Sequence, residues 1–263
     1  MTGDDLDVAR ARRWWRTGRR VGRIDRAARF VDDVGFALLF PTKGVELPSL
    51  WEAASDRPLA EAVEAWGGSD IDRVWRWKDE LPRRGLAWYG AFVRGRKSFL
   101  SPSLLADLYP RSGRPDDLDE ADLSPDARRI ARILLLDGPQ STAVLREALD
   151  VQGRVGGERF TRTVAELGRA LVVTNLGTRD EGTGWPSAIL ELTARAFTIP
   201  HGRDRDASHL RATRTFLDTM VFAQPYHLGN AFHWGASAAR DAFEELVSHG
   251  EADRDGPGYR LRH

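Results

Sequence analysis

The sequence predicts a mainly α-helical chain with small β-hairpins, which is an α+β fold class. Apolar residues recur at helical spacing along most of the chain, and short apolar runs flank turns rich in glycine and basic residues. This succession of helices and then a hairpin occurs three times at a spacing of roughly 70 to 90 residues. Helices followed by a basic hairpin are typical of winged helices, so we expect tandem winged-helix modules with small β-wings.

Composition and linkers suggest four segments. We expect a basic N-terminal arm over residues 1–24 and winged-helix modules over 25–110, 124–200 and 207–263. A linker rich in Gly, Pro and Asp (residues 111–123) separates the first two modules. The first module is expected to hold the active site.

The first module contains several local signals. A helical run from Asp25 stops at Gly35, and an apolar run over 36–40 suggests a strand or buried turn. The remaining expectations are a helix over 48–66, a helical turn over 71–77 before Pro82, a basic hairpin around Arg94-Gly95-Arg96-Lys97, and a last helix from Ser101-Pro102 to Tyr109.

The second and third modules repeat this order. Ser124 before Pro125 is an N-cap followed by proline at the first helical position, and Ser141 caps the next helix. The other expected elements are a helix over 160–171, a strand from Leu171, a wing tip at 182–185, helices over 210–221 and 236–249, and a hairpin over 251–261 that turns at Asp255-Gly256-Pro257-Gly258.

Composition excludes several classes of protein. The 263 residues contain no cysteine, which excludes disulfides and thiolate metal sites and fits a reducing cytoplasm. No apolar stretch has the length of a membrane helix, and no signal peptide is visible. We expect a monomeric cytoplasmic protein, associated with the nucleoid, with no membrane partner.

Basic residues are unevenly placed. The 39 basic and 39 acidic side chains cancel, but nine arginines lie between residues 10 and 29 beside Trp14 and Trp15. The arm either binds DNA phosphate and stacks on bases, ordering on its partner, or forms a surface helix whose arginines reflect genomic base composition. The expected DNA-binding residues are Arg12, Arg13, Arg16, Arg19 and Arg20 in the arm, Lys43 in the loop that also holds Glu46, and Arg94, Arg96 and Lys97 on the hairpin.

Three runs carry a family resemblance: FVDDVGFALLFP over 30–41, PSLWEA over 48–53 and WRWKDELP over 75–82, with a weaker match over 160–173 and at Trp185-Pro186. They resemble the AlkZ-type (YcaQ-like) interstrand-crosslink DNA glycosylases, and most closely the shorter AlkZ-related proteins. The resemblance implies a tandem winged-helix fold and base excision from DNA. In that family a Gln-x-Gln or Gln-x-Asp motif positions the catalytic water, whereas the matching residues here are Leu38, Leu39 and Phe40. Either activity is lost, or other polar residues have taken over.

Cleavage of an N-glycosidic bond builds positive charge on the sugar, so it requires a carboxylate, a group that assists the departing base, and a surface that receives the base. The run Trp77-Lys78-Asp79-Glu80 with nearby Trp75, Trp88 and Tyr89 offers all three. We predict Asp79 or Glu80 as the carboxylate, Lys78 as phosphate contact, leaving-group partner or Schiff-base amine, and a base pocket of Trp77, Trp88, Tyr89 and Phe40. Alternatively, the tryptophans are core residues, and Lys78 to Glu80 form a solvated turn before Pro82.

Other candidates are weaker. Asp32 and Asp33 are a second carboxylate pair or a solvated helix face. His227 and His233 flank a Gly-Asn turn but lack a third ligand at metal-site spacing, and the run from Gly153 to Gly157 lacks the lysine of a nucleotide-binding loop. We therefore expect no metal and no cofactor.

The sequence thus favours a DNA glycosylase that releases an alkylated or crosslinked purine, or a hypermodified phage base such as glucosyl-hydroxymethylcytosine, from double-stranded DNA. The role would be DNA repair or anti-phage defence. The alternatives are a non-catalytic winged-helix DNA-binding regulator and a protein–protein adaptor.

Overall fold

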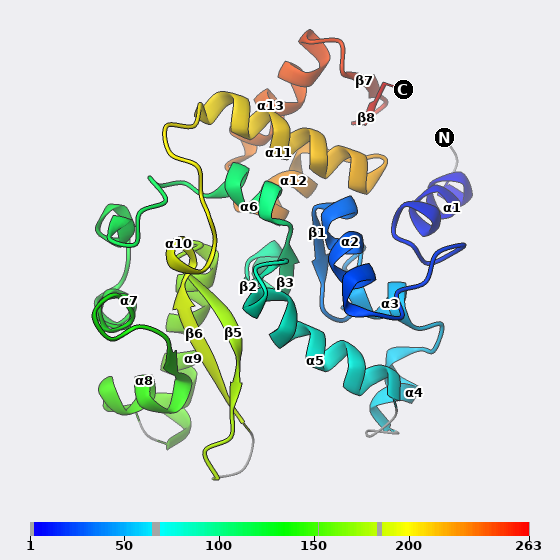
Figure 1. Cartoon of the computed structure of the whole chain (residues 1–263). Helices are drawn as coiled ribbons and strands as arrows, with labels where there is room; N and C mark the ends of the chain where they lie inside the picture. Colours follow the sequence, from blue (N-terminus) through cyan, green and yellow to red (C-terminus); the bar gives the residue numbers. More distant parts are fainter. Residues whose placement is uncertain (1–2, 65–68, 152, 183–185, 263) are drawn as a thin grey trace.

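The computed structural model describes residues 3–64, 69–151, 153–182 and 186–262. In these ranges helices dominate, and the strands form small antiparallel sheets (Figure 1). The predicted fold class, mainly helical α+β with tandem winged-helix modules, is confirmed.

The first unit follows the order helix, strand, helices and hairpin, and its sheet has the strand order β1-β3-β2. Helix α2 ends where predicted, because Gly35 takes a φ of 73° that favours glycine. The elements are α2 (Ile24–Val34), β1 (Phe36–Leu38), α3 (Leu50–Ala54), α4 (Leu59–Glu64), α5 (Ser69–Arg83), β2 (Trp88–Ala91), the 3-10 turn η1 (Val93–Gly95), β3 (Lys97–Leu100) and α6 (Pro102–Leu108).

Two expectations for this unit are wrong. The single helix over 48–66 is two short helices, because the chain is extended at Ser55 and Pro58 precedes α4. Helix α5 continues past Trp77 and contains Pro82 in its last turn, so Lys78, Asp79 and Glu80 lie on a helix and not in a turn.

The second unit repeats the same order around the sheet β4-β6-β5. Ser124 and Ser141 cap their helices as predicted, each accepting a hydrogen bond from a backbone N–H three residues later. Of the expected wing tip, residues 183–185 lie outside the described residues. The elements are η2 (Asp117–Glu120), α7 (Pro125–Asp137), β4 (Gln140–Ser141), α8 (Thr142–Ala148), α9 (Gly153–Arg169), β5 (Val173–Arg179), β6 (Ser187–Leu192) and α10 (Thr193–Ala196).

The third unit ends in the predicted hairpin, whose turn contains Gly256 at a φ of 57°. A bridge from Ala223 to Tyr259 adds a third, minimal strand. The expected Gly-Asn turn is wrong, because Gly229 lies inside a helix that ends at His233 in a left-handed conformation. The elements are α11 (Arg205–Met220), α12 (Pro225–Phe232), α13 (Ala236–Ser248), β7 (Ala252–Asp255) and β8 (Gly258–Leu261).

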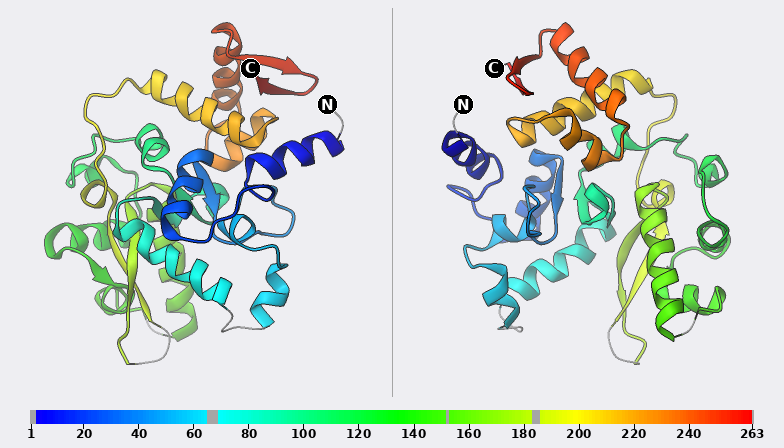
Figure 2. Two further views of the ribbon diagram at one scale, coloured as in Figure 1. Left: turned by 45° about the vertical axis from the view of Figure 1, so that its right-hand side comes forward. Right: turned by 180° about the vertical axis from the view of Figure 1, so that it is seen from behind.

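The sheet of the first unit is buried on both faces. In β3, Phe99 joins the core formed with α2 and α5, while Leu100 joins the core formed with α6, α11 and α12. In both views of Figure 2 the third unit (yellow to red) lies above the first (blue to cyan), and the second (green) lies beside it. The first unit is therefore the centre of the molecule.

The N-terminal arm is folded onto this centre. Helix α1 (Gly3–Arg13) packs on α11, and Trp14 is 2% exposed, with its indole N–H donating to the Thr219 carbonyl at 2.7 Å. Arg10 is also buried and donates through Nε to the Met220 carbonyl at 3.1 Å. Trp14 and Trp15 are thus core residues, and the expectation of an arm that offers them for base stacking is wrong.

The arm is therefore expected to contribute to global stability. Replacing Trp14 by alanine removes a large buried ring and leaves the Thr219 carbonyl unpaired, so the free energy of unfolding should fall by about 3–5 kcal/mol in denaturant titrations. Val8→Ala on α1 is the matched control, because Val8 is 51% exposed. A Trp14→Ala protein as stable as wild type would show that the arm does not belong to the cooperative fold.

Candidate active site

A pocket of about 450 Å³ opens where α5 of the first unit packs on β5 of the second. Its lining residues come from the segment after β1, the hairpin β2–β3, helix α5 and the second-unit strands. It is lined by Leu39, Phe40, Pro41, Thr42, Trp75, Lys78, Tyr89, Arg96, Lys97, Asn175, Thr178, Pro186 and Ala188.

One wall is aromatic. Phe40 stacks on Trp75 with ring centroids 6.2 Å apart and an interplanar angle of 15°. Trp75 is 37% exposed and lines the pocket. The ammonium of Lys78 lies 4.6 Å from the centre of the same indole ring. A flat, electron-rich surface with a cation beside it suits the stacking of a nucleobase.

Beside this wall lies a partly buried ion pair. Lys78 is 5% exposed, and its Nζ donates to Asp79 Oδ1 at 2.7 Å. The second carboxylate oxygen of Asp79 accepts a hydrogen bond from Thr178 Oγ1 at 3.4 Å. Both oxygens of Asp79 are thus held in place, one by the first unit and one by the second.

The pKa values of two neighbouring side chains are shifted by burial and by the charges of this ion pair. Burial, and then the Asp79 carboxylate, raise the pKa of Tyr89 above its usual range, so its phenol stays protonated and acts as a donor. Burial of the amine against the pocket, and then the charge of Lys78, lower the pKa of Lys97. The Lys97 side chain is exposed as a whole, and its Nζ lies 5.9 Å from the centre of the Tyr89 ring.

The second unit reaches the pocket through a distortion in β5. The register with β6 shifts between Asn175 and Gly177, and the Asn175 side chain accepts a hydrogen bond from the Gly177 N–H at 3.1 Å. Gly177 lies close to Asp79, where an added Cβ would contact that of Asp79 at 3.9 Å. Thr174 links β5 to β2, because its hydroxyl accepts a hydrogen bond from the Tyr89 N–H and donates one to the Tyr89 carbonyl.

The structure brings together only some of the predicted site residues. Phe40, Lys78, Tyr89, Arg96 and Lys97 line the pocket, and Asp79 lies at its edge.

Other predicted site residues lie elsewhere. Trp77 is buried among the helices of the first unit, and the Trp88 indole faces the opposite core and donates to Thr193 Oγ1 at 3.0 Å. Glu80 lies one residue further around α5 and pairs with Arg84 at 3.7 Å. The expectation that Trp77 and Trp88 form the base pocket is therefore not supported.

Most arm arginines bind carboxylates of the protein. Arg13 Nη2 lies 2.5 Å from Asp218 Oδ2, Arg16 pairs with Glu52 at 2.8 Å, and Arg20 pairs with Asp56. Asp33, one of the alternative carboxylates, accepts from Trp15 and pairs with Arg13 and Arg19, away from the pocket. Arg12, Asp32, Lys43 and Arg94 are exposed.

The basic hairpin is not a free wing. Its turn η1 packs on α12 and α9, and Nε2 of His233 lies 2.7 Å from the Phe92 carbonyl. His227 accepts a hydrogen bond from the Gln224 N–H, a helix-capping role. Within the described ranges, no group of three or more acidic or histidine side chains is arranged to hold a metal ion, and no helix is long and apolar enough to cross a membrane.

Comparison with known proteins shows which family the chain belongs to. The model of a family described as AlkZ related matches residues 21–221. The chain belongs to the AlkZ-related family. The AlkZ-related protein is also similar in fold to the solved structure of Streptomyces sahachiroi DNA glycosylase AlkZ, with a TM-score of 0.56 and 13% identity over 99% of this chain and 70% of that chain. No curated protein matches the sequence.

Sequence reasoning missed the half of the pocket that the second unit supplies. Asn175 and Thr178 lie about a hundred residues from Lys78, and no local pattern connects them. One weak signal was present, because a glycine inside a strand, here Gly177, often marks a bulge near a close approach.

The lowered pKa of Lys97 predicts an order of lysine reactivity. At pH 8 a larger fraction of Lys97 than of an ordinary lysine side chain is a neutral amine, while Lys43 is exposed and Lys78 is buried and ion-paired. An acylating reagent should therefore modify Lys97 first, Lys43 next and Lys78 last, as measured by peptide mass spectrometry. The rate at Lys97 should reach its plateau at a lower pH than that of an ordinary lysine amine, because its pKa is lowered. Equal rates for Lys97 and Lys43 at pH 8 would contradict the pocket's electrostatics.

Proposed function

We propose that this AlkZ-related protein is a DNA glycosylase that hydrolyses the N-glycosidic bond of a bulky or modified base and leaves an abasic site. The observation that carries the proposal is the pocket in which the Phe40–Trp75 stack stands beside the Lys78–Asp79 pair. Its volume of about 450 Å³ accommodates a base that has been turned out of the duplex. The AlkZ relation supports the same class of activity.

In this proposal each group has a role. The extruded base stacks on Trp75, and Asp79 orients a water molecule and stabilises the positive charge that develops on the sugar. Lys78 and the Tyr89 phenol are the hydrogen-bond donors available to the departing base. The C1′–N bond breaks, the water oxygen bonds to C1′ and loses a proton, and the base leaves with a proton.

The substrate remains a choice between two classes of base. Alkylated or crosslinked purines fit the family, whereas Leu39 and Phe40 make one side of this pocket apolar and suit a different base. A hypermodified phage base, such as glucosyl-hydroxymethylcytosine, is the second class, and its removal would serve anti-phage defence in place of repair. In either case double-stranded DNA contacts Arg94, Arg96 and Lys97 through its phosphates.

The test is base release. Purified protein is incubated with alkylated, crosslinked or glucosylated phage DNA and then with alkali, which cleaves strands at abasic sites. Strand breaks on one of these substrates and none on unmodified DNA are expected. Salt-dependent DNA binding without breaks on any substrate would instead support a non-catalytic winged-helix DNA-binding protein, consistent with apolar Leu38, Leu39 and Phe40 at the family's catalytic positions.

Asp79 and Glu80 form a matched pair for testing the carboxylate. Asp79→Asn should lower the single-turnover rate by about 100-fold or more, because the charge that faces the sugar is lost. Glu80→Gln should change it little, since Glu80 pairs with Arg84 on the surface of α5. Thermal unfolding and DNA affinity serve as controls for folding and binding. Equal rates for Asp79→Asn and wild type would overturn the assignment.

A further inference from the structure

A second cavity, of about 520 Å³, lies where the segments over 107–120 and 200–209 meet the ends of α9 and α12. It is separate from the pocket that holds Lys78 and Asp79, and none of its residues has a place in the proposed base excision. We call it the junction cavity. Its lining includes Tyr109, Arg111, Arg169, Arg203, Arg205 and Trp234.

The junction cavity is strongly basic. Four arginines line it, against two carboxylates, Asp107 and Glu120. Asp107 is already paired with Arg211, with Nη2 at 2.5 Å from Oδ1. Arg111 is likewise paired with Asp117, which leaves Arg169, Arg203 and Arg205 against Glu120. The lining thus keeps an excess of positive charge, from segments far apart in the sequence.

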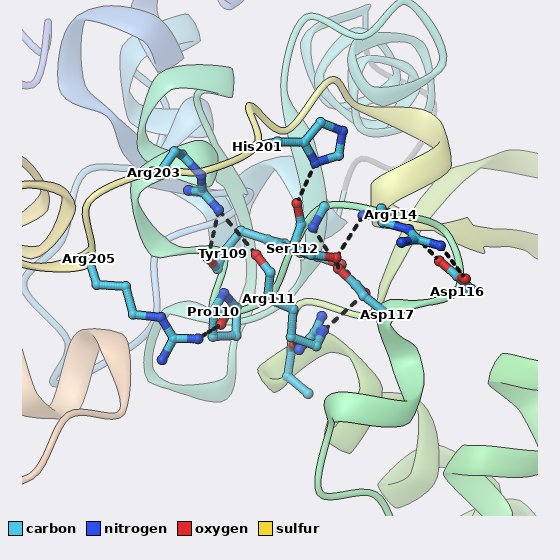
Figure 3. Close-up of polar contacts among 12 residues, drawn as sticks. Tyr109, Pro110, Arg111, Ser112, Arg114, Asp116, Asp117, His201, Arg203 and Arg205 are labelled. Carbon is cyan, nitrogen blue, oxygen red and sulfur yellow. Dashed lines mark hydrogen bonds and ion pairs between the residues drawn. The ribbon is translucent and has the colours of Figure 1, made fainter.

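Two of these arginines are fixed by carbonyl oxygens and not by carboxylates. Arg203 donates to the Pro200 carbonyl at 2.9 Å. It also donates to the Tyr109 carbonyl at 3.0 Å, and Arg205 donates to the Pro110 carbonyl at 2.5 Å (Figure 3). Carbonyls orient a guanidinium but leave its charge uncompensated. Burial, only partly offset by Asp107, lowers the pKa of Arg203 below its usual value.

A third arginine has an unused donor. The Arg111 side chain is 5% exposed, and it binds Asp117 through Nε at 3.2 Å and the Ala170 carbonyl through Nη1 at 2.9 Å (Figure 3). Its guanidinium lies 4.6 Å from the centre of the Tyr109 ring, and its buried Nη2 has no hydrogen-bond partner among the described residues. Arg111 therefore enters the lining of the cavity with one N–H group that makes no hydrogen bond.

Flat rings complete the lining. The His209 ring lies against Trp234 with centroids 4.6 Å apart, and Tyr109 and Phe92 are further wall residues. Guanidinium groups match phosphate oxygens, and aromatic faces receive bases. We propose that the junction cavity is a phosphate-binding site that takes the phosphate of a nucleotide, either a free nucleotide or a nucleotide of DNA. This site does not depend on the proposed glycosylase activity.

The test uses the full-length protein and three probes: inorganic phosphate, a free deoxynucleoside monophosphate and a short DNA duplex. Calorimetry and thermal shift measure binding to wild type and to Arg169→Glu. Arg169 is exposed and has no ion pair among the described residues, so this change should spare the fold. Arg129→Glu on α7 is the control, since Arg129 is an exposed arginine that lies outside the cavity.

Phosphate or the monophosphate should raise the melting temperature of wild type, and Arg169→Glu should weaken that binding about tenfold or more, while Arg129→Glu leaves it unchanged. If Arg169→Glu weakens binding of the DNA duplex alone, DNA is the source of the phosphate, and this result also supports the site. Absence of binding in all three arms, or equal weakening by both variants, would overturn the proposal.

Discussion

The sheet β1-β3-β2 has no solvent face, and this constraint shapes the rest of the molecule. A three-stranded sheet normally buries one face against its own helices, but here α11 and α12 of the third unit cover the other face as well. Every residue of the three strands except Lys97 is accordingly buried. Leu38 belongs to one core and Leu39 to the other, and each is at most 3% exposed. An amide side chain at Leu38 would need a buried hydrogen-bond partner, which gives a physical reason for apolar residues where the family uses glutamine.

The packing between units also determines the role of the helices. In a winged-helix DNA-binding module the third helix enters the major groove. Here the corresponding helices pack between units: α5 lies on β5, and α9 lies on β2 so closely that a Cβ at Gly168 would come within 3.0 Å of the Ala91 backbone. The modules thus act as building blocks for an interface. The pocket at α5 is a product of that packing, and the bulge in β5 places Gly177 against Asp79.

Signals that act within one turn of chain were readable in the sequence, and contacts across the chain were not. The caps at Ser124 and Ser141, the stop at Gly35 and the last hairpin follow from local chemistry. The role of the N-terminal arm does not follow from local chemistry, because an arginine that pairs with Asp218 looks the same in sequence as one that binds phosphate. For the same reason Trp88 and Tyr89 were placed in one pocket, although adjacent strand residues point to opposite faces.

The charge around the candidate pocket bears on how base excision would proceed. Lys78, Arg96 and Lys97 line it, and Asp79 is the carboxylate at its edge, already neutralised in part by Lys78. Asp79 is the one negative group that can face a cationic sugar, and the three positive groups around it favour a departing base that gathers negative charge. They also attract the flanking phosphates. On the proposed function, leaving-group stabilisation by Lys78 and protonated Tyr89 therefore works together with the carboxylate, and each compensates for a charge that the other cannot stabilise.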